Sequence, residues 1–151
     1  FILSGEKFME LKTKFHGTIN YDKKNVITFK KGIPGFENLK KFILVPAEEN
    51  SLFGILQSTE DTDIGIVVAS PFNACKNYEF DIDDDKISEL NIKDNKDILV
   101  VNTVTLDSNI ENITINLKAP IVINTKHNIG EQLILDNVDY PIKYPLFKGE
   151  V

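Results

Sequence analysis

Nine short segments of this chain have the composition of β-strands, and they constrain its fold more than any other feature. Each is rich in Ile, Val, Phe or Thr and is bounded by turn-forming residues. The segments are residues 14–19, 25–31, 42–45, 53–57, 64–70, 97–106, 112–117, 121–124 and 132–135. Most of them recur at intervals of roughly 8–15 residues, with few helix-length patterns between them, and this predicts an all-β, mainly antiparallel barrel or sandwich.

Local patterns refine this prediction. In residues 113–117 the apolar residues alternate with Thr and Asn, as a half-buried antiparallel strand requires. Residues 22–25 (DKKN) separate two strand-like runs and predict a hairpin turn. Residues 83–90 differ, because three aspartates precede Ile87 and Leu90 at helical spacing. We therefore expect a small β-barrel-like domain with one short helix.

The first eight residues (FILSGEKF) precede the only methionine of the chain, Met9. They lack the basic start and apolar stretch of a secretion signal. Met9-Glu10-Leu11 has the character of a natural start, so we expect residues 1–8 to be an added or upstream remnant. We expect residues 9–151 to form a single domain.

The charged residues restrict the kinds of partner. All 17 basic residues are lysines, set against 23 acidic residues, for a net charge of −6. Arginine is the side chain that forms bidentate hydrogen bonds to phosphate and guanine, so its absence argues against direct nucleic-acid binding. An acidic surface either steers a basic protein partner or simply keeps a small domain in solution.

Cysteine content and hydropathy indicate the compartment. Cys75 is the only cysteine, so no internal disulfide can form and a reducing, cytoplasmic location is expected. The longest apolar runs fall far short of the roughly 18 residues of a membrane span.

No catalytic or metal-binding motif is complete. Acids at positions 81, 83 and 85 match the start of a calcium loop, but Lys86 and Ile92 stand where Gly and Glu are required. Neither a nucleophile elbow nor a phosphate-binding loop occurs. We therefore expect no enzyme, no metal and no cofactor. The alternative is a small-ligand-binding or hydrolytic β-barrel protein that uses Cys75 with His127 or His16 as a thiol–imidazole pair.

Two loops are candidates for partner binding. In residues 32–36 (GIPGF), Pro34 and Gly35 predict a tight turn flanked by Ile33 and Phe36. These two apolar side chains either fold back to plug the barrel end or form a contact patch for a partner.

The second loop joins two strand-like runs at Ala119-Pro120, where proline predicts either a barrel corner or an exposed edge that another chain can pair with. The candidate partner-binding residues of the two loops are Ile33, Pro34, Gly35, Phe36, Asn116, Leu117, Lys118 and Pro120.

Five segments in this order resemble the flagellar assembly factor FliW family. They are FKKGIPGF (29–36), ILQS (55–58), PF (71–72) followed by YEF (78–80), TINLKAPIVIN (114–124) and GEQLIL (130–135). The resemblance runs from about residue 15 to residue 146. Cys75 and the absence of arginine fall outside these motifs.

The resemblance implies a non-enzymatic cytoplasmic regulator with a β-barrel-like fold. Such a protein binds flagellin and, when free of flagellin, binds and antagonises CsrA, an RNA-binding dimer that represses flagellin translation. The acids at 81–85 could mimic RNA phosphates and compete directly for CsrA. Alternatively, the protein docks elsewhere on CsrA and disturbs its RNA site indirectly, and the resemblance favours this indirect route. The helical terminal region of flagellin is the expected contact. We expect a monomer without nucleic-acid or membrane partners.

A purely structural flagellar subunit is disfavoured, because the chain lacks long helical heptads.

Overall fold

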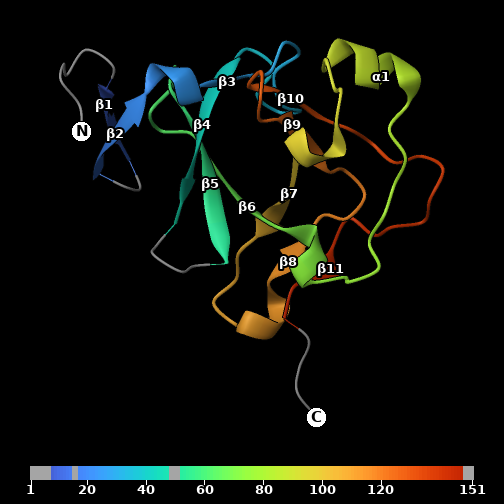
Figure 1. Ribbon diagram of the computed structural model, residues 1–151. Helices are drawn as coiled ribbons and strands as arrows, with labels where there is room; N and C mark the ends of the chain where they lie inside the picture. Colours follow the sequence, from blue (N-terminus) through green and yellow to red (C-terminus); the bar gives the residue numbers. More distant parts are fainter. Residues whose placement is uncertain (1–7, 15–16, 48–51, 148–151) are drawn as a thin grey trace.

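The computed structural model describes residues 8–14, 17–47 and 52–147, and this part of the chain forms strands and one short α-helix (Figure 1). The strands are β1 (Phe8–Thr13), β2 (Gly17–Asp22), β3 (Ile27–Thr28), β4 (Lys41–Pro46), β5 (Phe53–Ser58), β6 (Gly65–Ala69), β7 (Ile98–Thr105), β8 (Thr114–Ile115), β9 (Ile121–Asn124), β10 (Ile129–Gln132) and β11 (Tyr144–Pro145). The helix is α1 (Asp84–Glu89), which confirms the short helix predicted within 83–90.

Seven strands close into a ring in the order β7-β6-β5-β4-β3-β10-β9 and back to β7. Strand β7 closes it because its residues 98–101 pair with β9 and its residues 102–103 pair with β6. Its last residues pair with β8, which in turn pairs with β11 outside the ring. The pairings are antiparallel except that of β3 with β10. The predicted all-β, mainly antiparallel, barrel-like fold is therefore confirmed.

The buried side chains form three clusters. The first comes from the ring strands and their turns, and in it the Phe29 and Phe42 rings meet edge to face at 5.5 Å. The second surrounds Tyr78 and Leu117, and the third lies between α1 and β9. Burying one large apolar side chain contributes about 1.5–3 kcal/mol, so these clusters supply the main stabilisation of the fold.

The first hairpin differs from the prediction. Of the predicted strand 14–19, residues 17–19 lie in β2, whereas Lys14 follows the end of β1, and β1 and β2 pair in a separate two-stranded sheet. The predicted hairpin turn at residues 22–25 is also wrong, since Lys23–Asn25 is a 3-10 turn and β2 does not pair with β3. The partner of β2 is β1, which begins at Phe8 in the segment set aside as a remnant. The other seven residues of that segment lie outside the described residues.

Within the described residues, no helix has the length and apolar character needed to cross a membrane.

Candidate functional site

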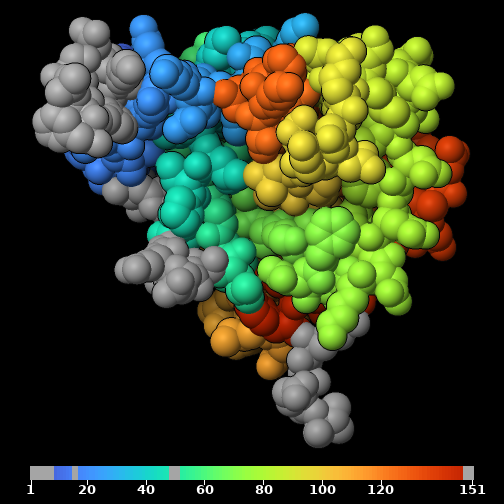
Figure 2. Space-filling view, viewed as in Figure 1, coloured from blue at the N-terminus to red at the C-terminus, as the bar shows by residue number. Residues whose placement is uncertain are grey.

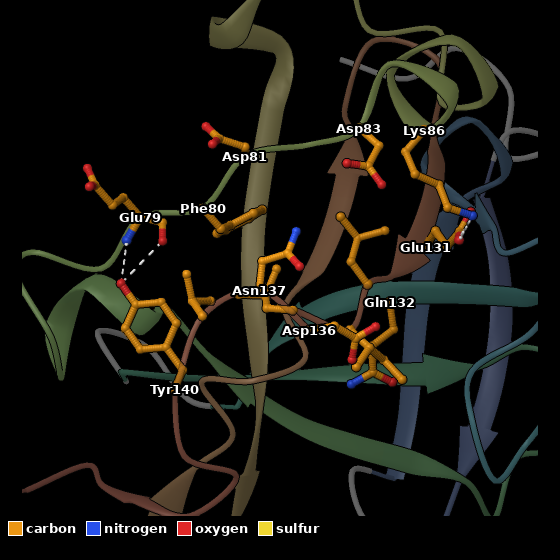
Figure 3. A pocket seen from close by; sticks show the side chains of 14 residues that line it. Glu79, Phe80, Asp81, Asp83, Lys86, Glu131, Gln132, Asp136, Asn137 and Tyr140 are labelled. Atoms are coloured by element: carbon orange, nitrogen blue, oxygen red, sulfur yellow. Dashed lines mark hydrogen bonds and ion pairs between the residues drawn. The ribbon is translucent and has the colours of Figure 1, made fainter.

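A groove of about 750 Å³ lies between two stretches that are distant in sequence (Figure 3). One wall is the chain that leads into α1, and the other is the end of β10 with the chain that follows it. In Figure 2 these stretches, yellow-green and red, meet at the right edge of the molecule. The lining residues are Glu79, Phe80, Asp81, Asp83, Lys86, Glu131, Gln132, Leu133, Ile134, Leu135, Asp136, Asn137, Val138 and Tyr140.

Acidic and apolar side chains share this groove. Its charged lining consists of five carboxylates and one lysine, Lys86. The carboxylates are Glu79, Asp81, Asp83, Glu131 and Asp136. Leu133 and Leu135 are buried beneath the groove, where Phe80 packs against both of their clusters. A binding site of this composition suits a cationic ligand that also carries apolar groups.

A polar contact closes the groove at each end (Figure 3). At one end the Glu79 N–H donates to the Tyr140 hydroxyl oxygen at 3.1 Å, and that hydroxyl donates to the Glu79 carbonyl at 3.2 Å. At the other end Lys86 Nζ lies 2.5 Å from Glu131 Oε2. The hydrogen bond to Glu131 raises the pKa of Lys86. These contacts tie the two walls together.

Tyr78 anchors the groove wall to the interior. Its side chain is 3% exposed, and its ring centroid lies 4.7 Å from that of Tyr140 and 5.6 Å from that of Phe80. Its hydroxyl donates to the Leu117 carbonyl at 2.7 Å and accepts from Asn102 Nδ2 at 3.3 Å. Burial raises the pKa of Tyr78 to about 12.

No local pattern in the sequence predicts this groove. Acids 81–85 and the motif 130–135 are both distinctive in the sequence, but nothing in the sequence places them against each other. Tyr78 belongs to the YEF motif at 78–80, whereas no local sequence pattern around Tyr140 marks it as a site residue.

The loop at residues 32–36 forms the predicted tight turn. Gly35 has a φ of 92°, and the Phe36 N–H donates to the Ile33 carbonyl at 2.6 Å. Ile33 is 2% exposed and packs in the first cluster, as the plug interpretation requires. Phe36 is 37% exposed, and Pro34 and Gly35 are also at the surface. Partner binding by this loop stays a prediction, and burial excludes only the Ile33 side chain from direct contact.

The bend at residues 116–120 is a corner built by the Asn116 side chain. Its Oδ1 accepts from the Lys118 N–H at 2.9 Å and from the Ala119 N–H at 3.2 Å. Leu117 is 0% exposed and Pro120 is buried, while Asn116 and Lys118 are partly exposed. Leu117 and Ile33 belong to different clusters, so the two loops do not share a core. Partner binding here also stays a prediction.

The residues of the catalytic alternative belong to different parts of the fold. Cys75 is half-buried in the second cluster, whereas His127 is exposed in the turn between β9 and β10. His16 lies outside the described residues. No cluster of three or more His, Cys, Asp or Glu side chains that could hold a metal ion occurs in the described ranges.

Comparisons with known proteins agree along almost the whole chain. The family model described as "FliW protein" matches residues 10–146. A flagellar assembly factor FliW of Clostridium kluyveri is 70% identical over 143 residues, covering 95% of this chain and 99% of that protein. One from Clostridium botulinum is 54% identical over 142 residues, covering 94% of this chain and 99% of that protein.

A solved structure is equally similar in fold. The crystal structure described as that of the flagellar assembly factor FliW superposes with a TM-score of 0.87 at 36% identity, covering 95% of this chain and 100% of that one.

Proposed function

The chain belongs to the FliW family, and on this premise we propose that it is a non-enzymatic, cytoplasmic flagellar assembly factor that binds flagellin and CsrA in alternation. When free of flagellin, it binds CsrA and relieves the repression of flagellin synthesis. The observation that carries the proposal is the 70% identity to a flagellar assembly factor along 99% of that protein's length.

The surface of the chain suits protein partners of this kind. CsrA, as an RNA-binding protein, presents basic groups, and this chain carries a net charge of −6 with five carboxylates around one groove. Complementary charge accelerates the encounter of two proteins and disfavours wrong partners.

The regulatory behaviour follows from mutually exclusive binding. If flagellin and CsrA cannot occupy the protein together, each lowers the apparent affinity of the other by the same factor. The free concentration of flagellin then sets the amount of CsrA that is captured. Export of flagellin frees the protein to bind CsrA again.

Calorimetry with purified partners tests the proposal. CsrA from the same organism is titrated into the protein, first alone and then after flagellin has been added. We expect saturable CsrA binding that flagellin abolishes. Binding of flagellin alone would reduce the role to that of a chaperone, and binding of neither protein would refute the proposal.

The route of CsrA antagonism can be tested separately. Asp83, Asp84 and Asp85 are all exposed at the start of α1. Their replacement by Asn abolishes antagonism if they mimic RNA phosphates, but only slows association if CsrA is disturbed indirectly. We favour the indirect route.

The turn at residues 32–36 offers a matched pair for mapping contacts. Phe36→Asp should weaken partner binding and leave the fold intact, because Phe36 is partly exposed. Ile33→Asp should instead unfold the protein, because its side chain is buried in the first cluster. Unchanged affinity of the folded Phe36 variant for both partners would exclude this turn from either interface.

A further inference from the structure

Among the residues that the structure describes, one wall of the groove is a strand edge without a partner strand. Beyond β10 the chain continues to pair on its inner side, where the N–H groups of Leu133 and Leu135 each donate at 2.8 Å to the carbonyls of Pro120 and Lys118. Strand β3 covers the outer side at Ile129 only. Because N–H groups alternate in direction along a strand, those of Ile134 and Asp136 point outward, and neither makes a hydrogen bond within the described chain.

The opposite wall also has free backbone groups. Residues 79–83 form neither helix nor strand, and Asp83 has the extended φ and ψ of −59° and 149°. In the part of the chain that the structure describes, the N–H groups of Phe80, Asp81 and Ile82 make no hydrogen bond. The groove therefore lies between two stretches that both offer backbone donors and acceptors.

We propose that this groove binds an extended polypeptide segment carrying lysine or arginine side chains, which adds to the open edge at residues 132–136 as a further strand. An edge of this kind is a template for strand addition. Glu131 is paired with Lys86, and the other four carboxylates of the lining select a basic segment. Phe80 and Val138 offer contacts to its apolar side chains. The inference rests on the proposed function in one respect only, namely that the partner is a protein.

The dimensions agree with a short strand. Residues 131–138 line the groove without interruption, and the Lys86–Glu131 and Tyr140–Glu79 contacts mark its two ends. At about 3.3 Å per residue, a bound segment of about five residues spans the open edge at residues 132–136.

Binding of an alternating peptide tests the class of ligand. The probe is an acetylated and amidated eight-residue peptide, (Lys-Val)4, titrated into the isotope-labelled protein and followed by nuclear magnetic resonance. We expect saturable binding that weakens as salt is raised, with protection from hydrogen exchange appearing at the Ile134 and Asp136 amides. The matched (Glu-Val)4 peptide should not bind. Absence of (Lys-Val)4 binding, or binding without protection of these two amides, overturns the proposal.

Two variants of Ile134 distinguish the contribution of its backbone N–H to peptide binding from that of its side chain. Ile134→Pro removes the outward N–H without breaking an internal hydrogen bond, since proline is tolerated at strand edges. Ile134→Ala keeps the N–H and removes most of the side chain, which is already exposed. We expect the proline variant to lose about tenfold or more in peptide affinity relative to the alanine variant. Equal affinities refute strand addition, and unfolding curves check that both variants are folded.

Charge is tested by replacing two carboxylates on opposite walls. Asp81→Asn combined with Asp136→Asn should weaken (Lys-Val)4 binding and reduce its salt dependence. Asp84→Asn combined with Asp85→Asn, outside the groove lining, should leave the affinity unchanged. These experiments need neither flagellin nor CsrA, so failure of the groove proposal and failure of the proposed function are distinguished.

Discussion

At the scale of single residues, a few polar groups determine how the chain is held together. The Tyr78 hydroxyl connects the wall of the groove, the bend at 116–120 and Asn102 of β7. Asn124 connects β9 to the end of α1, because its Nδ2 donates to the carbonyls of Leu90 and Asn91. Buried polar groups of this kind cost free energy unless each finds a partner, so they select one arrangement of the surrounding elements.

The raised pKa of Tyr78 predicts a dependence of stability on alkaline pH. Burial raises this pKa from 10.0 to about 12, so the folded state keeps the proton that the unfolded chain releases. The contribution of Tyr78 to the unfolding free energy is complete below pH 10 and falls as the pH rises towards 12. Ultraviolet titration should show a tyrosine ionisation with its midpoint near pH 12. Tyr78→Phe should remove this late transition, and its persistence would assign it to another residue.

Gly130 is predicted to accept no side chain. A Cβ added there would lie 2.7 Å from Cε2 and 2.8 Å from Cζ of the Phe29 ring, which is fully buried. Gly130→Ala should therefore lower the unfolding free energy by about 1–3 kcal/mol in urea denaturation. The double variant Gly130→Ala with Phe29→Leu should be destabilised by less than the sum of the losses of the two single variants. Losses that add up strictly would contradict the proposed clash.

At the scale of elements, the β1–β2 hairpin and the ring are held differently. The hairpin forms its own sheet, and those of its residues whose side chains the structure describes belong to none of the three buried clusters. The ring strands supply the first cluster and share long ladders, such as the five-residue pairing of β4 with β5. Elements with few buried apolar contacts open at lower free energy than the rest of a protein.

Hydrogen exchange should therefore separate the hairpin from the ring. We expect the amides in the middle of β1 and β2 to exchange by local opening, faster than those of β4 and β5, which require global unfolding. Native-state exchange in increasing denaturant measures the opening free energy of each amide. Equal values in the hairpin and the ring would show that the two sheets unfold together.

At the scale of the whole molecule, closure of the ring by β7 and β9 makes distant strands interdependent. Four residue pairs, Ile98–Asn124 to Val101–Ile121, join these strands. Strand β10 is part of this closed ring, and the groove forms where the end of β10 faces the chain that leads into α1. Loss of packing where β7 pairs with β9 should lower the stability of every strand of the ring.

Val122→Ala tests this interdependence. Val122 is fully buried in β9 and packs in the cluster beneath α1. The substitution should lower the opening free energy of the β4–β5 amides by about 1–2 kcal/mol, the same loss as in global unfolding. The control, Leu11→Ala in β1, should lower protection in the hairpin and leave β4–β5 unchanged. A loss confined to β9 and its neighbours would contradict cooperative closure.

Much of the local structure could be predicted from the sequence because its causes are local. Period-two alternation and β-branched residues identified most of the strands, the aspartates at 83–85 identified the start of α1, and Pro34-Gly35 identified the turn. The segment 132–135 was predicted as a strand and does pair with 118–120, although the regular strand ends at Gln132. The five motifs at 29–36, 55–58, 71–72 with 78–80, 114–124 and 130–135 together also predicted the family, which the family model confirms.

Only the tertiary structure decided which strands pair and what they enclose. No local pattern shows that β2 pairs with β1, that β7 divides its pairing among three strands, or that Ile33 turns inward while Phe36 stays partly exposed. The groove combines Asp81 with Asp136, and the ring contact of Tyr78 joins it to Tyr140, across more than fifty residues of chain. Pairings at such separation depend on ring closure and shared burial, which are properties of the folded chain as a whole and leave no periodic trace in the sequence.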